Sequence, residues 1–314
     1  MRICSLLPSA TEILFALGLG DSVAGVTHEC DFPPEAAKKP RLIRPRVDSK
    51  TAPAELDRQV TELVRRGESI YGVDAELLRS ISPDLIVTQD LCHVCAASPD
   101  DLATALSRMP KRPRVLSLTP HSLAAVWDDI RRVGEVTCCR REAQALALSL
   151  EQRVAAIEMK AAQTATRPRV LCLEWLDPFY VGGHWVPEMV AKAGGEDVLG
   201  RRGEPSVRVT AEQIAESRPE VIVVMPCGYS LERAATECAK LVLPDSWRLL
   251  PAVEGRRVFA VDANSYFSRP GPRLADGVAI LGEILHPGEK LAPLPGASLA
   301  RLETVGSVHK IANF

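Results

Sequence analysis

The clearest hydrophobic pattern lies in residues 141–163, where apolar side chains recur mostly at intervals of three and four. They are Ala143, Leu146, Ala147, Leu150, Val154, Ile157 and Ala161. This spacing places one apolar stripe along an α-helix, and no glycine or proline interrupts the segment. Because the residue before a proline avoids the helical conformation, the helix ends before Pro168. The pattern predicts a single long helix of roughly 35 Å.

Short apolar runs alternate with helical patterns on both sides of this helix. In the first half, the runs that predict strands are residues 2–7, 22–26, 84–88 and 115–118. Strands separated by helical patterns imply right-handed crossovers and parallel sheets. Two proline-rich segments break the alternation. Residues 30–66 are predicted to be an irregular insertion, and residues 286–314 to lie on the surface.

The second half of the chain repeats the first. RICSL at 2–6 matches RVLCL at 169–173, and Glu76 and Glu212 each stand seven residues before a proline that precedes an apolar run. We therefore predict an α/β protein with two Rossmann-like lobes, each with a parallel sheet, joined by the single long α-helix. The predicted boundaries are 1–120 for the N-terminal lobe, 121–166 for the helical connector, 167–290 for the C-terminal lobe and 291–314 for a surface tail.

Composition excludes several classes of protein. A hydrophobic fraction of 46% and a charged fraction of 25% are typical of a soluble globular protein. A net charge of −2 argues against nucleic-acid binding, and no apolar run reaches the length of a membrane span. No signal peptide is evident, which predicts a cytoplasmic protein as written, or a periplasmic (extracytoplasmic) one if an export signal was removed. Nine cysteines, with Cys138 and Cys139 adjacent, favour free thiols in a reducing compartment.

Candidate binding residues follow the predicted strands, because parallel sheets bind ligands at the carboxyl ends of their strands. The first lobe offers polar side chains there, namely Ser9, His28, Asp90 and His93. The second lobe offers aromatic rings, namely Trp175, Phe179, Tyr180, Trp185, Tyr229, Tyr266 and Phe267. This clustering favours a wall for a large, partly flat ligand with polar edges, and the alternative is ordinary loop packing.

Cys92 and Cys95 have the C-x-x-C spacing found in zinc, iron–sulfur and redox sites. No second pair accompanies them, so we expect no stoichiometric zinc or iron. A packing role, a ligand contact by His93, and metal or redox chemistry stay open. His28 and Cys30, in the sequence HECD, leave a similar choice between a metal site and a loop cap or cleft wall. The dinucleotide fingerprint, the nucleophile elbow and the Walker A motif do not occur.

The order PSATE, HECDFPP, TQDLCHVC, a long helix, EWLDPFYVGGHWVPEMVAKAGG and SRPGPRLADG resembles the cobalamin-binding substrate proteins of ABC importers. The resemblance extends to about Leu285. It implies that the protein binds cobalamin or a related corrinoid in the cleft between two lobes, as an importer's substrate-binding protein or a cytosolic relative. It implies no catalysis and no cofactor besides this ligand. His93 is one candidate ligand for the cobalt of the corrinoid. Ser206 stands where the family has a ligand-contacting tryptophan.

Taken together, the strand ends and the resemblance give a set of expected ligand-binding residues. They are Ser9, His28, Tyr71, Asp90, His93, Trp175, Phe179, Tyr180, Trp185, Tyr229, Tyr266, Phe267 and Arg269. Glu76 and Glu212 match the family's glutamates that dock onto arginines of a membrane permease, so the resemblance implies an ABC permease as partner.

Two alternatives to corrinoid binding stay open. The first is a protein that binds haem or a ferric chelate. Arginine-rich clefts suit siderophore carboxylates, and the strand-end loops contribute only Arg269, which disfavours this alternative. The second is a cytosolic metal-dependent or corrinoid-modifying enzyme that uses His28, Cys92, His93 and Cys95.

Overall fold

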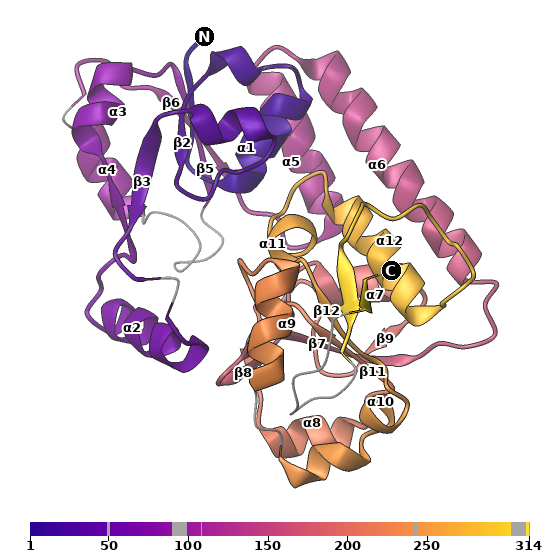
Figure 1. Ribbon diagram of the computed structural model, residues 1–314. Helices are drawn as coiled ribbons and strands as arrows, with labels where there is room; N and C mark the ends of the chain where they lie inside the picture. The colour runs from indigo at the N-terminus through magenta and orange to yellow at the C-terminus, as the bar shows by residue number, and fades with distance from the viewer. Residues whose placement is uncertain (49–50, 90–98, 108, 241–243, 303–311, 314) are drawn as a thin grey trace. The chain divides into compact units, whose positions relative to one another are not determined.

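The computed structural model of the chain describes every residue except 49–50, 90–98, 108, 241–243, 303–311 and 314. The chain divides into two compact units (Figure 1). Unit 1 contains Met1–Pro120 and Ala125–Leu148, and unit 2 contains His121–Ala124 and Ser149–Phe314. Each unit is built around its own sheet of mainly parallel strands with a buried core, which confirms the predicted α/β class.

The sheet of unit 1 has the strand order β4-β3-β2-β1-β5-β6. Its strands are β1 (Ile3–Ser5), β2 (Val23–Thr27), β3 (Arg41–Pro45), β4 (Tyr71–Val73), β5 (Leu85–Gln89) and β6 (Arg114–Leu118). Neighbouring strands run parallel except β4, which is antiparallel to β3. The parallel strands therefore all end at one edge of the sheet, which we call the carboxyl edge, and β4 begins there with Tyr71 opposite Pro45.

Helices pack on this sheet or extend from it. They are α1 (Pro8–Ala16), α2 (Pro53–Arg65), α3 (Ala75–Ile81), α4 (Pro99–Ser107) and α5 (Leu123–Val136), with short 3-10 turns at Gly20–Ser22 and Pro34–Lys38. The prediction of an irregular insertion over residues 30–66 is wrong, because this segment contains β3 and α2. Strand β3 escaped the pattern because only Leu42 and Ile43 are apolar in it, although both side chains are buried.

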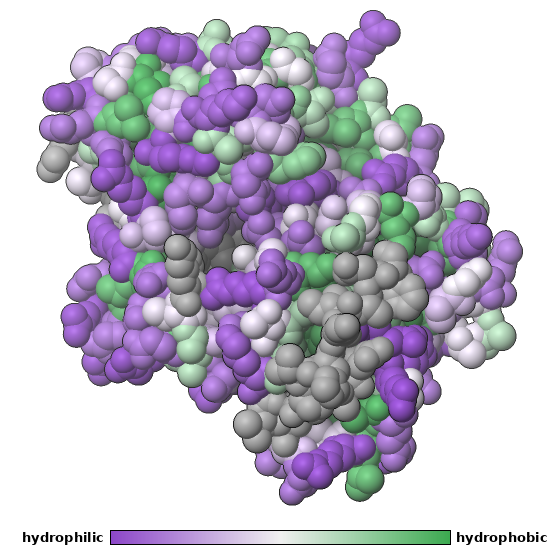
Figure 2. Space-filling view, in the orientation of Figure 1, coloured by the Kyte–Doolittle hydropathy of each residue, from purple (hydrophilic) through white to green (hydrophobic). Residues whose placement is uncertain are grey.

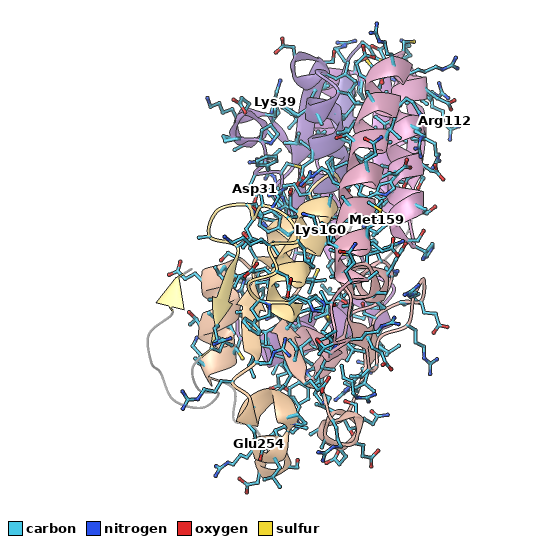
Figure 3. All side chains as sticks on the ribbon, turned by 90° about the vertical axis from the view of Figure 1, so that its right-hand side faces the viewer. Asp31, Lys39, Arg112, Met159, Lys160 and Glu254 are labelled. Atoms are coloured by element: carbon cyan, nitrogen blue, oxygen red, sulfur yellow. The ribbon has the colours of Figure 1, made fainter. Side chains whose placement is uncertain are left out.

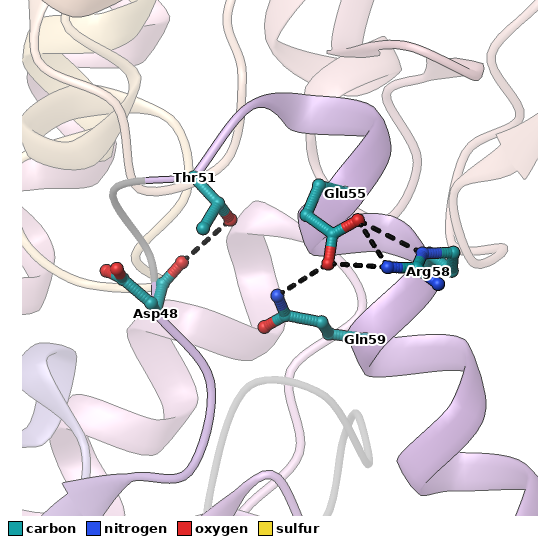
Figure 4. Close-up of polar contacts among 5 residues, drawn as sticks. All are labelled: Asp48, Thr51, Glu55, Arg58 and Gln59. Atoms are coloured by element: carbon teal, nitrogen blue, oxygen red, sulfur yellow. Dashed lines mark hydrogen bonds and ion pairs between the residues drawn. The ribbon is translucent and has the colours of Figure 1, made fainter.

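Helix α2 carries apolar residues at helical spacing, at Leu56, Val60 and Leu63, but it stands in a segment rich in proline and charge and was overlooked, and none of its residues is fully buried. Its polar side chains bond to one another instead (Figure 4). Glu55 accepts hydrogen bonds from Arg58 at 2.7 Å and from Gln59 at 2.9 Å, and Thr51 Oγ1 donates to the carbonyl oxygen of Asp48 at 2.9 Å just before the helix. Local contacts of this kind contribute only a few tenths of a kcal/mol each, so α2 is held more weakly than the packed helices.

The predicted long helix is α6 (Arg140–Ala161), which passes from unit 1 into unit 2. Six of its seven predicted stripe residues are buried, and Leu146 is partly buried. The opposite side is exposed, as Met159 shows with 65% of its surface accessible. Figure 3 labels Met159 and Lys160 on the second half of the helix. Lys160 Nζ donates to the carbonyl oxygen of Leu291 at 2.9 Å, which ties this half to unit 2.

The sheet of unit 2 has the order β10-β8-β7-β11-β12-β13-β14, with β9 beside β7. Its strands are β7 (Arg169–Leu176), β8 (Phe179–Val181), β9 (Glu196–Asp197), β10 (Val207–Arg208), β11 (Val221–Val224), β12 (Val258–Val261), β13 (Leu299–Arg301) and β14 (Ala312–Asn313). Strands β9, β7, β11 and β12 are parallel, and the others are antiparallel to their neighbours. Its helices are α7 (Val186–Lys192), α8 (Ala211–Ser217), α9 (Leu231–Lys240), α10 (Pro251–Glu254), α11 (Ala263–Tyr266) and α12 (Leu274–Leu285), with a 3-10 turn at Asp245–Leu249.

The prediction that residues 286–314 form a surface tail is wrong for two parts of the described segment, although residues 287–290, 293–294 and 296–297 are exposed. His286 and Leu291 are buried, and β13 joins the sheet antiparallel to β12, with Ala300 opposite Ala260. Leu299 and Ala300 are buried in this pairing. The strand is only three residues long and lies close to prolines and glycines, so its sequence carries no recognisable period.

The repeat seen in the sequence is also a repeat of local structure. Helices α3 and α8 both have seven residues, and a side chain caps the start of each. The Asp74 side chain accepts a hydrogen bond from the Leu77 amide in α3, and the Thr210 side chain accepts one from the Gln213 amide in α8. Both end on a non-glycine residue with positive φ, at Ser82 (φ 47°) and Arg218 (φ 43°). A proline then leads each helix into a central strand, β5 or β11.

An acidic residue just after each proline fastens the start of the first strand. Asp84 Oδ2 accepts a hydrogen bond from the Arg2 amide at 2.9 Å, and Glu220 Oε2 accepts one from the Arg169 amide at 2.8 Å. In return, the amides of Asp84 and Glu220 donate to the carbonyl oxygens of Arg2 and Arg169, both at 2.8 Å. The two units therefore share one frame of strand, helix, proline and carboxylate.

The surface shown in Figure 2 is mostly hydrophilic, with apolar residues scattered among polar ones. Across the part of the chain that the structure describes, we find no helix with the length and apolarity needed to cross a membrane.

Candidate functional site

Two of the predicted binding residues meet at the carboxyl edge of unit 1. His28 follows β2 directly, and Tyr71 opens β4. Their ring centroids are 5.5 Å apart with planes tilted by 45°. Burial lowers the pKa of His28, while the neighbouring Glu29 carboxylate opposes this shift. His28 is therefore mainly neutral at pH 7, and its ring packs as a partly apolar surface beside Tyr71.

Ser9 lies at the same edge, as the second residue of α1. Its side chain is 1% exposed, and its Oγ has no hydrogen-bond partner among the described residues. A buried hydroxyl without a partner costs free energy, so a ligand acceptor or a water is expected to satisfy it. The predicted binding residues Asp90 and His93, like Cys92 and Cys95, lie outside the described residues.

Small polar side chains fix the loop after β2. Thr11 Oγ1 donates to Ser5 Oγ at 2.8 Å, and the sulfur of Cys30 lies 3.1 Å from Thr11 Oγ1 and 3.2 Å from Thr27 Oγ1. Cys30 is 1% exposed, so its thiol is part of a buried cluster. Within the described ranges, no group of three or more His, Cys, Asp and Glu side chains is arranged to hold a metal ion. These contacts favour a loop-capping role for Cys30.

In unit 2, the edge where the parallel strands end carries a hairpin. Strand β7 ends at Leu176 and the chain returns as β8, so that Trp175 lies opposite Tyr180. Trp175 packs edge-on against Tyr229, with centroids 5.5 Å apart and planes at 65°, and its Nε1 donates to the carbonyl oxygen of Asp177 at 3.1 Å. Trp175 and Tyr180 are only partly buried, so both rings keep surface that a ligand can contact.

Tyr229 supports Trp175 rather than offering a free face of its own, since it is 2% exposed. The guanidinium carbon of Arg233 lies 3.8 Å from the Tyr229 ring centroid, and Arg233 Nη2 is 3.1 Å from the tyrosine hydroxyl. Burial raises the pKa of Tyr229, and the charge of Arg233 opposes this shift. Sequence reasoning missed Arg233, although its position four residues after Tyr229 is the spacing of a helical contact.

Three more of the predicted binding residues are packed inside unit 2. Trp185, Phe267 and Arg269 are 5%, 2% and 7% exposed. Trp185 Nε1 donates to the carbonyl oxygen of Phe267 at 2.8 Å, and Arg269 Nη2 donates to Asn264 Oδ1 at 2.9 Å. These contacts indicate that the three side chains shape the loops instead of presenting free surface.

Phe179 and Tyr266 are both partly buried, but they pack against different surroundings. Phe179 stacks on the buried Trp247, with centroids 4.9 Å apart and planes at 30°, and packs against the core of unit 2. Tyr266 is only partly buried, and the guanidinium carbon of Arg273 lies 5.7 Å from its ring centroid. Tyr266 therefore joins Trp175 and Tyr180 as a ring with accessible surface.

A carboxylate beside these rings was not predicted. Glu174 precedes Trp175 on β7, and its Oε2 accepts a hydrogen bond from Ser206 Oγ. Both side chains are partly buried, and the carbonyl oxygen of Glu174 accepts a hydrogen bond from the Cys227 amide at 3.1 Å. The pair joins positions 32 residues apart, so no local pattern announces it. It fixes a hydrogen-bond acceptor one residue before Trp175 on β7.

Glu76 and Glu212 occupy the first turns of the matched helices α3 and α8, and both are exposed. The positive end of each helix dipole favours a carboxylate there. In α8, the hydrogen bond with Thr210 holds the pKa of Glu212 below its usual value. Both carboxylates are thus available to a partner.

Comparison with known proteins gives a consistent family. The family profile described as periplasmic binding protein matches residues 3–265. The uncharacterized ABC transporter substrate-binding lipoprotein YvrC of Bacillus subtilis is 28% identical over 298 residues, covering 91% of this chain and 80% of that protein. A vitamin B12-binding protein of Vibrio cholerae is 24% identical over 292 residues, covering 88% and 86%.

Among solved structures, a periplasmic heme-binding protein of Roseiflexus in its apo form is similar, with 25% identity and a TM-score of 0.69. The alignment covers 92% of this chain and 98% of that one. With a profile that spans most of its length and a matching two-unit α/β fold, the chain belongs to the periplasmic binding protein family.

Proposed function

We propose that this protein is the substrate-binding protein of an ABC importer and that it binds cobalamin or a related corrinoid. Its proposed contacts on unit 2 are the accessible rings of Trp175, Tyr180 and Tyr266, and the candidate ligand residues of unit 1 are Ser9, His28 and Tyr71. Binding and release need no catalytic step. The protein supplies shape, aromatic surface and hydrogen bonds, as family members do for their cargo.

The observation that supports this proposal most is the way the Trp175 side chain is packed. Its ring is backed by Tyr229, on which Arg233 packs in turn, yet it keeps accessible surface at the edge where parallel sheets bind ligands. A rigid aromatic ring suits a large macrocycle, because it buries area at little entropic cost. The Glu174 carboxylate, one residue before Trp175, accepts hydrogen bonds, which suits the amide groups around a corrin ring better than the propionates of haem.

Haem is the second candidate, because the Roseiflexus structure is that of a heme-binding protein. Titration of the purified protein with cobalamin, with cobinamide and with haemin, followed by absorption and calorimetry, separates the two. We expect one corrinoid per chain and weaker or no binding of haemin. Binding of haemin alone supports the second candidate, and no binding of any of the three contradicts both.

A variant of Trp175 locates the site. Trp175→Ala should weaken corrinoid binding by about 1–3 kcal/mol, which is the usual cost of removing a central aromatic contact. Trp175→Phe keeps most of the ring area and should retain most of the affinity. Unchanged binding by the Ala variant moves the ligand away from this edge.

We also propose that Glu76 and Glu212 dock the protein onto its permease. Exposed charges of this kind set orientation and encounter rate more than affinity. Glu76→Lys combined with Glu212→Lys should leave corrinoid binding unchanged and abolish association with the reconstituted permease. Glu216→Lys, on the exposed side of α8, is the matched control and should still associate. Loss of ligand binding or of the fold in the double variant assigns both residues a structural role.

The location that suits this function is outside the cytoplasmic membrane, and we favour it over the cytoplasm. YvrC, for example, is named a lipoprotein. Cell fractionation with antibodies against the native protein tests this, since recovery in the cytosol contradicts the importer role without affecting ligand binding.

A further inference from the structure

Two histidines that the proposed function does not use lie side by side in unit 2. His121 follows β6 in the short segment that belongs to unit 2, and His184 follows β8. Their ring centroids are 5.7 Å apart, with planes tilted by 45°. Ordinary packing of two rings also gives such a distance. The surroundings of each ring therefore decide whether the pair can bind a ligand.

His184 is held in a conformation that few side chains adopt. Its φ is +51°, in the left-handed region. Its amide donates to the carbonyl oxygen of Glu204 at 2.6 Å, and its carbonyl oxygen accepts from the Gly203 amide at 2.9 Å. Gly183 makes this approach possible, because a Cβ there would lie 2.5 Å from the Glu204 carbonyl oxygen. The backbone thus fixes where the imidazole stands.

The side chain of His184 has an unused buried atom. Its Nδ1 is buried and has no hydrogen-bond partner among the described residues. The ring also stacks on the buried Trp185, with centroids 5.6 Å apart and planes at 30°, which limits its rotation. A fixed imidazole with a buried nitrogen that lacks a partner is costly unless something binds it.

His121 is anchored to the same part of unit 2 from the other side. The Leu123 amide, two residues later, donates to Glu188 Oε2 at 2.9 Å. Glu188 lies in the first turn of α7, which starts directly after Trp185. The segment of His121 is therefore held by α7, the helix that begins directly after Trp185, on which His184 stacks.

We propose that His121 and His184 together bind one divalent transition-metal ion of the copper, nickel or zinc type. Neutral imidazole is a preferred ligand of these ions. With metal–nitrogen bonds of about 2.0–2.1 Å and a roughly tetrahedral angle, two imidazoles on one ion have centroids about 5–5.5 Å apart. The observed 5.7 Å needs only a small adjustment. A ligand bond would also use the buried nitrogen of His184.

Such a site is open rather than closed. The described residues contain no group of three or more His, Cys, Asp and Glu side chains around a common point, so this chain supplies two ligands and the other positions go to water or to a donor from another molecule. An open site of two imidazoles suits moderate, exchangeable binding more than a permanent structural ion.

The test uses the full chain with Cys92→Ser, His93→Gln and Cys95→Ser, which removes the candidate ligands of the C-x-x-C segment. Copper(II) and nickel(II) chlorides are titrated by calorimetry, and the copper complex is examined by electron paramagnetic resonance. We expect one ion per chain and hyperfine splitting from two nitrogens.

Two single variants identify the ligands. His121→Gln changes an exposed side chain, and His184→Asn keeps a residue that tolerates positive φ, so both should fold, as checked by melting without metal. Each should weaken binding by about tenfold or more and remove one nitrogen from the spectrum. His28→Gln, in unit 1, is the matched control and should bind the ion normally. No stoichiometric binding, or binding that both variants leave intact, overturns the proposal and leaves the two rings as packing.

Discussion

The first strand ends differently in the two units, although the frame around it is the same. In unit 1, β1 ends at Ser5 and the chain enters α1 at Pro8. In unit 2, β7 continues to Leu176 and turns back as β8. At the same position of the repeat, unit 1 therefore has the start of a helix with a buried serine, and unit 2 has a hairpin with accessible rings.

This difference shows where the repeat has freedom. The strands, their capped helices and the carboxylates Asp84 and Glu220 are matched between units, and changes there would disturb the sheet. The connections after the strands carry no such constraint and have diverged. In unit 1 they offer hydrogen-bonding groups such as Ser9, and in unit 2 aromatic area such as Trp175. Function in this fold is carried by the loops on a common scaffold.

The largest expected effect breaks the loop structure of unit 2. Gly183→Ala places a Cβ 2.5 Å from the Glu204 carbonyl oxygen and 2.5 Å from the Ser206 amide nitrogen. Backbone atoms cannot rotate away, so we expect a loss of about 2–3 kcal/mol in the free energy of unfolding, measured in urea. The control is Gly72→Ala in β4 of unit 1, where the Cβ meets Arg46 at an ordinary 3.7 Å. Equal stability of the two variants contradicts the close approach.

A smaller effect of opposite sign concerns Asp197 in β9. Its Oδ1 accepts from the amides of Leu199 and Gly200, while Oδ2 is buried and lacks a partner among the described residues. Burial raises the pKa of Asp197 from 3.8 to about 6. The folded state thus holds a proton that the unfolded state releases, and stability falls as pH rises from about 4 to 6.

Asp197→Asn removes this dependence, because an amide does not ionise. We expect the variant to be more stable than the natural protein above pH 6, by about 1–2 kcal/mol at pH 8, and to lose that advantage near pH 4. Urea unfolding at pH 4, 6 and 8 checks this. A variant that is less stable at pH 8 would show that the ionised carboxylate is favourable.

Variants of the helix caps test whether the matched caps of the two units contribute equally to the free energy of unfolding. Thr210→Ala in unit 2 and Asp74→Ala in unit 1 each remove a side chain that accepts a hydrogen bond from a helix amide. Both should cost about 1 kcal/mol of unfolding free energy. Arg44, which also pairs with Asp74, is largely exposed and should add little. A clear difference between the two variants would show that the caps contribute unequally to stability despite their matched geometry.

The smallest effect comes from the carboxylate at the start of β5. Hydrogen bonds from the Arg2 amide and from Lys111 lower the pKa of Asp84 from 3.8 to about 2. The stabilisation is present above pH 4 and is lost as pH falls toward 2. Asp84→Asn should therefore melt slightly earlier than the natural protein at pH 7, and the two should melt together near pH 2. A difference that persists at pH 2 would point to lost packing.

The sequence predicted the frame well because that frame depends on local patterns. The buried stripe of α6 follows a regular spacing, and the central strands are short apolar runs next to capped helices. Strand β13 lacks such a signal, because it is only three residues long. Helix α2 has apolar residues at helical spacing, at Leu56, Val60 and Leu63, but the proline and charge of the segment around it suggested an irregular insertion.

The sequence could predict which loops carry candidate site residues, but not the contacts that their side chains make. Position after predicted strands selected Trp175, Tyr180 and Tyr266, whose rings keep accessible surface. The same rule selected Trp185 and Phe267, which turn inward because tertiary hydrogen bonds hold them. The Glu174–Ser206 pair joins distant segments, so only the folded chain reveals it.

The late strand β13 has a consequence for how the protein is made. Leu299–Arg301 pairs with β12, and the amide of Leu302 donates to the carbonyl oxygen of Val258 at 2.9 Å. During synthesis the residues of unit 1 have all been added once Leu148 is in place, so that unit can fold while the ribosome still works. Unit 2 gains the strand that covers β12 only after residue 302 has left the ribosome exit tunnel. Until then, the edge of β12 is open to pairing with other nascent chains.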